Sequence, residues 1–485
     1  MSNVILWFRR DLRLADNPAL QYAVEQGHRI LPLFIWEPDE DSDWTPGAAS
    51  RWWLHHSLVH LQHQLRRLGA DLIIQSGDPA QILAQLGKQY AIDEILWNRL
   101  YEPHQVVRDG NLKTTLIDTG IVARSFNARL LIEPWQLLKG DGGPYRVFTP
   151  FWKMLQRLYV ESRPKAAPTS LNAISVADTD NLPIDALRLL PDKPWDEGLY
   201  SHWRPGEIGA HARLHAALDG ALIDYTTGRD HPGHAGTSRL SPHLHFGELG
   251  PRQVWFAVRA WAAGNSGPGY VEAADSFLRQ LGWREFAIHL LYHFPHTADA
   301  PLDARFNHMP WSTDAGTALR AWQTGRTGIP IVDAGMRELW QTGWMHNRVR
   351  MLVASLLTKN LRIHWLEGAR WFWDTLVDAD LANNTLGWQW VAGCGADASP
   401  YFRIFNPVVQ GERFDPKGDY VRQWVPELRA LPEKWIHQPA AAPANVLAEA
   451  NIELGRDYPL PIVDLKTSRE DILRLWDIIK RQPRE

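Results

Sequence analysis

The chain has 485 residues and a formal net charge of −4, so it is long enough for two or three domains and carries no uniformly basic coat for nucleic acid. Its single cysteine, Cys394, excludes an internal disulfide and a cysteine-rich metal site, and is typical of a reducing cytoplasm. No apolar run approaches the ~18 residues of a membrane span, and charged residues follow the first eight positions, unlike in a secretion signal.

Residues 1–132 are predicted to form an α/β domain with a doubly wound parallel sheet. Helical patterns at 50–69 and 78–90 alternate with short buried strands, expected at 3–8, 30–36, 71–75, 92–97 and 121–126. This alternation favours a parallel sheet. The turn after the first strand, RRDLRLADNP, has no G-x-G-x-x-G, which argues against a dinucleotide bound there.

Residues 133–204 are proline-rich and aperiodic, and are predicted to be an interdomain linker with a few helical turns. From 205 to 485 the strand signal disappears. Helical patterns follow one another at 206–228, 250–264, 270–294, 329–361 and 368–377. The sequence therefore predicts a large all-α second domain.

The candidate chemistry lies in this helical part. In HAGTSRLSPHLHFGELG (234–250), small hydroxyl residues surround Arg239 just before a helical pattern, an arrangement that can bind phosphate. An N-cap and turn is the alternative. In GWMHNRVRM (343–351), Asn347, Arg350 and Met351 fall on one helix face that could contact a polar aromatic ligand, or could be an ordinary surface.

The apolar residues of the stretch DADLANNTLGWQW (378–390) follow neither the helix nor the strand period, so this stretch is not predicted to be a packed helix. Asp378 and Asp380 are two residues apart, which puts them on different sides of a helix or strand, so we expect them to do different jobs. This spacing disfavours a tryptophan-rich glycosidase. The sequence also contains no H-E-x-x-H and no G-x-S-x-G, so we expect no metal centre and no serine hydrolase.

Seven segments occur in order from residue 7 to residue 407: WFRRDLRLADNPAL, GTSRLSPHLHFGEL, LGWREF, TGIPIVDAGMREL, GWMHNRVRM, DADLANNTLGWQW and SPYFRIFNP. Together they resemble the photolyase/cryptochrome family of blue-light flavoproteins. The resemblance covers almost the whole chain. It implies an N-terminal α/β domain, a long linker and a helical domain that holds FAD in a U-shaped conformation.

The resemblance implies a set of FAD-binding residues: Tyr225, Thr237, Ser238, Arg239, Leu240, Ser241, Phe277, Arg284, Asn347, Arg350, Asp378, Asp380 and Asn384. Within this set, Arg350 is expected to pair with Asp378, and Asn384 to face flavin N5. A neutral amide cannot readily give a proton to the flavin, whereas an aspartic acid could. Asn384 therefore suits an enzyme that keeps FADH⁻ as its electron donor, as repair members of the family do.

Tryptophan is unusually frequent, with 25 residues, and any single one is expected to serve core packing. The resemblance singles out Trp388, Trp365 and Trp311 as a relay that passes electrons from the surface to the photoexcited flavin. A side branch through Trp371 or Trp373 is the less favoured arrangement.

The resemblance also implies a pocket for a cyclobutane pyrimidine dimer flipped out of DNA, whose unstacking cost aromatic walls partly recover. Its residues are expected to be Gln280, Trp283, Asn347, Met351 and Trp390, with Arg284, Arg348 and Arg403 on the flanking phosphates. Repair of (6-4) lesions is disfavoured because the helix offers a single histidine, His346. The expected function is light-driven repair of such dimers in DNA by a cytoplasmic monomer that associates with the nucleoid and needs no obligate protein partner or membrane. A cryptochrome photoreceptor without repair activity is the alternative, disfavoured because no low-complexity tail follows the helical part.

Two positions depart from the family pattern. Gln280 stands where dimer photolyases usually have glutamate, so it brings no negative charge to the lesion. His104 and Gln105 replace the familiar folate contacts. The segment GAASRWWLHHSL (47–58) nevertheless resembles plant cryptochromes and bacterial class III photolyases, which bind 5,10-methenyltetrahydrofolate. A folate antenna in the N-terminal domain is therefore predicted.

Overall fold

Five parallel strands form the N-terminal sheet. The computed structural model describes residues 2–38, 44–177, 181–265, 267–397 and 402–482. The strand order is β3-β2-β1-β4-β5, and the bounds are β1 (Asn3–Phe8), β2 (Arg29–Trp36), β3 (Ile73–Ser76), β4 (Glu94–Asn98) and β5 (Val122–Phe126). Because β1 pairs in parallel with both β2 and β4, the chain reverses its winding direction there, and the predicted doubly wound sheet is confirmed.

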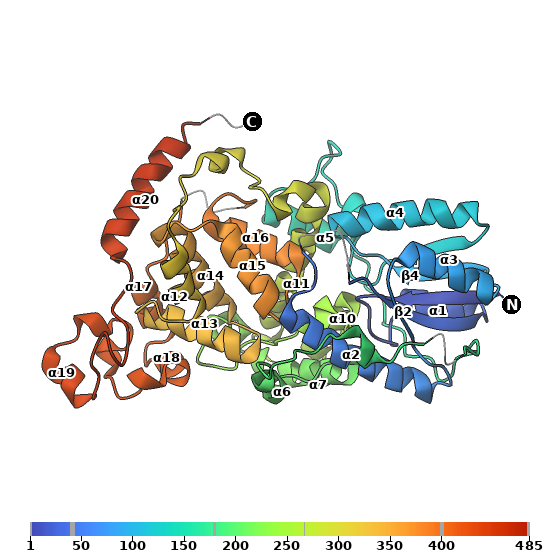
Figure 1. The fold of residues 1–485 in the computed structure, drawn as a ribbon, viewed down its shortest axis with the longest axis horizontal. Helices are drawn as coiled ribbons and strands as arrows, with labels where there is room; N and C mark the ends of the chain where they lie inside the picture. Colours follow the sequence, from blue (N-terminus) through green and yellow to red (C-terminus); the bar gives the residue numbers. More distant parts are fainter. Residues whose placement is uncertain (1, 39–43, 178–180, 266, 398–401, 483–485) are drawn as a thin grey trace.

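Helices cover both faces of this sheet (Figure 1). They are α1 (Pro18–Glu25), α2 (Ala48–Arg67), α3 (Pro79–Gln89) and α4 (Pro103–Asp118). The two predicted helical patterns correspond to α2 and α3. Alternate residues of β1 enter different core clusters, with Val4 and Leu6 on one side and Ile5 and Trp7 on the other. This burial of both faces explains why the strands read as continuous apolar runs.

The segment 133–204 is more ordered than a connection with a few helical turns. It contains α5 (Phe148–Leu158) and α6 (Glu197–His202). In α5 the buried residues Phe148, Phe151, Trp152 and Leu155 follow helical spacing and form one apolar face. Residue 173 also bridges to Ile30 of β2, so part of this segment packs on the sheet. The bounds 1–132, 133–204 and 205–485 stay a prediction.

The rest of the described chain is helical. Its α-helices are α7 (Glu207–Ala216), α8 (Tyr225–Gly228), α9 (Ser241–His245), α10 (Pro251–Gly264), α11 (Tyr270–His293), α12 (Gly316–Gln323), α13 (Pro330–Thr342), α14 (Asn347–Ser355), α15 (Trp365–Thr375), α16 (Leu381–Ala392), α17 (Pro407–Phe414), α18 (Asp419–Trp424), α19 (Ala444–Glu449) and α20 (Leu465–Ile479). The stretch predicted as helical at 329–361 is two helices, because Gly343 adopts φ 66° after α13 and His346 caps α14. In Figure 1, α11, α14, α15 and α16 lie between the sheet and the C-terminal helices.

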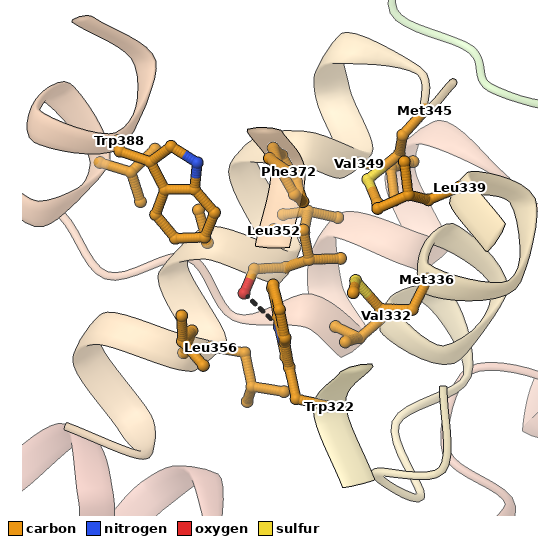
Figure 2. Packing of buried hydrophobic residues seen from close by; sticks show 14 of the residues in the cluster. Trp322, Val332, Met336, Leu339, Met345, Val349, Leu352, Leu356, Phe372 and Trp388 are labelled. Atoms are coloured by element: carbon orange, nitrogen blue, oxygen red, sulfur yellow. Dashed lines mark hydrogen bonds between the residues drawn. The ribbon is translucent and has the colours of Figure 1, made fainter. Parts of the chain in front are cut away.

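The core of the helical part holds these central helices together. Trp322 of α12 is fully buried, and its indole N–H donates to the Val353 carbonyl at 2.9 Å. Its ring lies 6.2 Å from that of Trp388 and 6.2 Å from that of Phe372. Figure 2 shows these three side chains among the residues packed around them. Because this cluster contacts α14, α15 and α16 at once, it fixes their relative positions. Among the described residues, no helix is long and apolar enough to span a membrane.

Candidate functional site

Helix α16 contains most of the stretch DADLANNTLGWQW. Asp380 is its N-cap and accepts a hydrogen bond from the Asn383 N–H at 3.0 Å. The expectation that this stretch is no packed helix was wrong. Helices α11, α14 and α15 all contact α16, so it has apolar contacts around most of its circumference and shows no amphipathic period.

One face of α16 carries three buried residues at intervals of four. Asp380, Asn384 and Trp388 are 6%, 9% and 2% exposed. Four residues make about one turn of helix, so the three side chains lie one above the other. An acid, an amide and an indole are thereby presented in a row.

Asp378 and Asp380 have different partners, as predicted. Arg350 of α14 donates through Nη2 to both carboxylate oxygens of Asp378, at 3.1 and 3.0 Å. This confirms the predicted ion pair. Asp380 instead lies 3.5 Å from Arg129 Nη2 and 3.4 Å from His245 Nδ1.

The charged groups around Asp380 interact with others next to the sheet. Arg10, just after β1, lies 2.7 Å from Glu102, which precedes α4. Although burial opposes it, the positive charges of Arg10 and Arg129 lower the pKa of Glu102 to about 2. Burial likewise opposes ionisation of Asp380, but His245, Arg129 and Arg284 hold its pKa well below the usual range. Both acids are therefore charged at neutral pH.

Sequence reasoning missed Arg129 and His245. Arg129 is 251 residues from Asp380, and His245 is 135 residues from it. Neither residue stands in a local pattern that indicates such a partner. Burial lowers the pKa of His245, so its ring is neutral beside the charged Asp380.

Asn384 and Trp388 pack against α15. The Asn384 amide nitrogen donates to the Ala369 carbonyl at 3.0 Å. A Cβ atom at Gly368 would lie 2.0 Å from the Trp388 ring, so this close approach requires glycine. Trp365, at the start of α15, is 1% exposed, whereas Trp311 is half-buried. The three predicted relay residues thus come from α16, α15 and the segment before α12.

The predicted phosphate-binding segment precedes α9. Thr237, Ser238 and Arg239 are half-buried, Ser241 is exposed and Leu240 is buried. The helix that follows, α9, has only five residues, so its dipole is small. Arg239 adopts φ 51°, and its guanidinium lies over the Trp344 ring at 4.5 Å and 3.9 Å from Glu338.

Tyr225 and Phe277, two further residues predicted to bind FAD, contact each other. Their rings, from α8 and α11, lie 5.1 Å apart in an edge-on arrangement. Both side chains are buried. Burial raises the pKa of the Tyr225 hydroxyl to about 12, so it remains protonated and can donate.

Several buried N–H groups here have no hydrogen-bond partner among the described residues. They are Arg229 Nε, His346 Nε2, Arg348 Nε and Trp388 Nε1. The His346 Nδ1 accepts from the Arg348 N–H, and burial lowers the His346 pKa to about 4, so Nε2 bears the ring proton. Buried donors without a partner in the protein can be satisfied by ordered water or by a polar ligand. Together with the acids and aromatic rings, they fit a ligand with phosphate, ribose and ring systems, as FAD has.

The residues predicted to contact the lesion are partly packed against the protein. Trp283 stacks on Phe148 of α5 with ring centroids 3.7 Å apart. The Trp390 indole N–H donates to the Asp397 carbonyl at 3.1 Å, and the Gln280 amide to the Ser276 carbonyl at 3.3 Å. Met351 is half-buried against the helical core. The structure therefore holds both tryptophans in fixed orientations.

The predicted phosphate contacts differ in accessibility. Arg403 and Asn347 are exposed. Arg284 is 8% exposed and donates to the Arg129 carbonyl at 2.7 Å, and Arg348 donates to Asp230 at 2.6 Å. Because Arg284 and Arg348 already have partners within the protein, Arg403 is the best placed of the three for DNA. Residues 399–401 of SPYFRIFNP lie outside the described residues.

The N-terminal part has a cavity of about 780 Å³ at the carboxyl edge of its sheet. Its lining comes from the segments after β2 and β3, the start of α3 and one side of α4: Glu37, Pro38, Gly77, Asp78, Pro79, Ala80, Pro103, His104, Val107, Arg108, Asn111, Leu112 and Thr115. The segment 47–58 is not part of this lining, since most of it forms the largely buried first half of α2. Within the described residues, no cluster of three or more histidine, cysteine or acidic side chains could hold a metal ion.

Comparison with known proteins gives consistent matches along the chain. A model described as DNA photolyase matches residues 4–169, and one described as the FAD binding domain of DNA photolyase matches residues 277–477. The deoxyribodipyrimidine photo-lyase of Agrobacterium fabrum is 47% identical over 99% of this chain and 98% of that protein. Cryptochrome-2 of Arabidopsis thaliana is 41% identical over 97% of this chain and 78% of its own length. The crystal structure of a bacterial class III photolyase from Agrobacterium tumefaciens gives a TM-score of 0.94 at 46% identity, covering 99% of this chain and 98% of that one.

Proposed function

The chain belongs to the photolyase/cryptochrome family, and from this membership we propose that it is a light-driven DNA lyase that splits cyclobutane pyrimidine dimers. One observation carries the proposal. The buried face of α16 presents Asp380, Asn384 and Trp388 in a row, which provides a charged anchor, a neutral amide and an oxidisable ring for one flavin.

The residues that we propose to hold FAD surround this face. Thr237, Ser238 and Ser241 offer hydroxyls to the phosphates, and the unpaired N–H groups of Arg229, Arg348 and His346 offer further donors. Asp378 pairs with Arg350 and Asp380 with Arg129, and their carboxylate oxygens can also accept from ribose hydroxyls and flavin N–H groups. When bound in its reduced state, FAD would supply the photoexcited electron needed to split the dimer.

Asn384 sets the protonation chemistry beside the flavin. Its amide nitrogen is held by the Ala369 carbonyl, which can only accept, so Oδ1 is left as an acceptor. An amide also has no proton to give at neutral pH. The side chain can therefore accept a hydrogen bond without protonating its partner, which suits an enzyme that works with the anionic reduced form.

Trp388, Trp365 and Trp311 are proposed to carry electrons inward. Trp388 lies on the proposed flavin face of α16, Trp365 is fully buried and Trp311 is half-buried. This order runs from the flavin toward solvent. The relay returns inactive enzyme to its reduced state and is not needed when the flavin is reduced chemically.

Trp283, Trp390 and Met351 are proposed to hold the flipped dimer. Phe148 covers one face of Trp283, so its other face remains for a base. The exposed Arg403 is proposed to contact a flanking phosphate, which fits a chain whose overall charge is negative.

Two further proposals concern the antenna and the setting in which the enzyme works. We propose 5,10-methenyltetrahydrofolate as an antenna in the N-terminal domain, and a monomer that acts in the cytoplasm on chromosomal DNA without a protein partner. The absorption spectrum of chromophore released from purified protein tests the first proposal. Light scattering of the protein with and without dimer-containing DNA tests the second.

The proposed function is tested by illuminating dithionite-reduced protein with an oligonucleotide that contains one thymine dimer. Light-dependent loss of the dimer, absent in the dark, is the expected result. Trp388→Phe should repair equally well under these conditions, because chemical reduction bypasses the relay. A protein that binds flavin and leaves the dimer intact would instead be a photoreceptor of the cryptochrome type.

A further inference from the structure

His364 lies between two of the proposed relay tryptophans. Its imidazole centroid is 5.0 Å from that of Trp311 and 5.8 Å from that of Trp365. The second pair is nearly parallel, with an interplanar angle of 29°. The hydrogen bond from the Ser312 N–H to the Arg362 carbonyl, at 2.7 Å, holds the segment of Trp311 against the start of α15.

The same histidine caps α15. Its Nδ1 accepts a hydrogen bond from the Leu366 N–H at 3.2 Å. An accepting Nδ1 carries no proton, so the ring is neutral and its proton is on Nε2. Protonating Nδ1 would remove the cap, so helix geometry opposes a charged ring at this position.

The surroundings also favour a neutral ring. Burial lowers the pKa of His364, while Glu367 raises it and Arg370 lowers it. Both of these charged residues are exposed on α15, as is Arg362 just before it. Trp311 itself packs against the apolar side chains of Met309, Ile472 and Ile479.

We propose that His364 is a positioning residue of the relay, which keeps the outer electron transfer from Trp311 to Trp365 favourable by remaining uncharged between the two rings. This inference rests on the proposed function, because it requires the relay. An imidazolium at this distance would repel the positive charge that moves through the pair.

The proposed step moves one electron between neighbouring tryptophans of the relay. Trp365, after giving one electron to Trp388, takes one electron from Trp311. Trp311 is left with one positive charge and releases its indole proton to water. A small thiol or other one-electron reductant in solution then restores Trp311. No bond to His364 forms or breaks, and its role is electrostatic.

The test compares the parent protein with His364→Asn, which keeps a capping side chain but cannot titrate. The measured quantity is the initial rate of light-driven flavin reduction with a fixed reductant, taken as the ratio of parent to variant at each pH. This ratio cancels the pH dependence of the reductant. We expect a ratio near one at about pH 8 that falls by about threefold or more at acidic pH, as the ring gains a proton below its ordinary pKa of 6.5. The exposed His308, three residues before Trp311, gives the control His308→Asn, whose profile should follow the parent.

A second variant reverses the sign of the charge. His364→Asp also caps a helix, and its carboxylate favours positive charge on the neighbouring rings. Its rate at about pH 5 should therefore exceed that of His364→Asn. Equal rates in parent, Asn and Asp variants across the pH range would overturn the proposal.

A spectroscopic readout does not depend on enzyme activity. In protein with ¹⁵N-labelled histidine, the His364 signal, assigned by its loss in His364→Asn, should report an Nε2–H tautomer at neutral pH. Its titration midpoint should coincide with the midpoint of the rate ratio. A Nδ1–H tautomer, or midpoints that differ, would contradict the inference. Dimer repair by chemically reduced protein bypasses the relay, so failure of the proposed function would appear there and not in these profiles.

Discussion

Two sets of buried tryptophans show that burial does not mark a redox role. Trp7 and Trp97, on neighbouring strands of the sheet, are as buried as Trp365 and Trp388. Their indole N–H groups, like that of Trp388, have no partner among the described residues. Neither criterion separates the two sets.

The charges around the rings do separate them. Arg9 and Arg108 lie over the Trp7 ring, at 4.7 and 5.2 Å from its centroid, and Lys113 lies 5.7 Å from that of Trp97. In the described part of the chain, no lysine or arginine is positioned in this way over Trp311, Trp365 or Trp388. A cation over a ring makes loss of an electron less favourable. The rings at the edge of the sheet are thus less suited to losing an electron than the three tryptophans of the helical part.

The largest expected effect tests this contrast with the same substitution in both regions. Trp388→Phe should lower light-driven flavin reduction by at least about a hundredfold, because phenylalanine cannot be oxidised by the flavin. Trp97→Phe should leave the rate within about twofold and lower the free energy of unfolding by about 1–3 kcal/mol. Absorbance changes under blue light measure the first effect, and urea unfolding the second. Equal photoreduction in the two variants would remove Trp388 from the relay.

A second prediction concerns the charges at the sheet edge. Since the pKa of Glu102 is about 2 in the folded protein and 4.5 in an unfolded chain, its ionisation stabilises the fold above about pH 4.5. This contribution, about 3 kcal/mol, is lost as the pH falls from 4.5 toward 2. Glu102→Gln should therefore unfold at lower urea concentration at neutral pH, and the gap from the parent should narrow with acid. A gap that stays constant with pH would show that Glu102 is not charged in the fold.

Trp283 belongs to neither set of buried tryptophans. Its ring stacks on Phe148, and its proposed ligand is a base of the damaged DNA. Trp283→Ala should weaken binding of dimer-containing DNA by about five- to a hundredfold, the effect of losing about 1–3 kcal/mol of stacking. Binding of undamaged duplex, which depends on phosphate contacts, should change by less than about twofold. Fluorescence anisotropy with matched duplexes measures both. Equal losses would assign Trp283 a purely structural role.

The smallest expected effect concerns the packing of α15 against the Trp388 ring. Gly368→Ala places a Cβ 2.0 Å from the Trp388 ring, so it should cost about 1–3 kcal/mol of stability and weaken flavin binding. Gly387→Ala is the control, since this position on α16 is open and alanine favours the helix by about 1 kcal/mol. Thermal unfolding and flavin titration distinguish them. A Gly368→Ala protein as stable as the control would mean that α15 and α16 can separate without cost.

The sequence by itself determined the parallel sheet, the helical second part and the pair Arg350–Asp378. Strand and helix periods are local, and the ordered motifs carried the pair. The sequence did not reveal the helix α16, because a helix packed on several sides loses the amphipathic period that identifies helices. Its motifs named the relay residues, but they did not show that, in the described part of the chain, no lysine or arginine lies over these rings.

Only the tertiary structure brought Arg129 and His245 to Asp380, and His364 between Trp311 and Trp365. Apart from the neighbours His364 and Trp365, these partners are separated by tens to hundreds of residues, so no local pattern encodes their contact. Their distances follow from how α15 and α16 pack on the elements around them. That packing is decided by the whole core at once, since each side chain must fill the space left by the others.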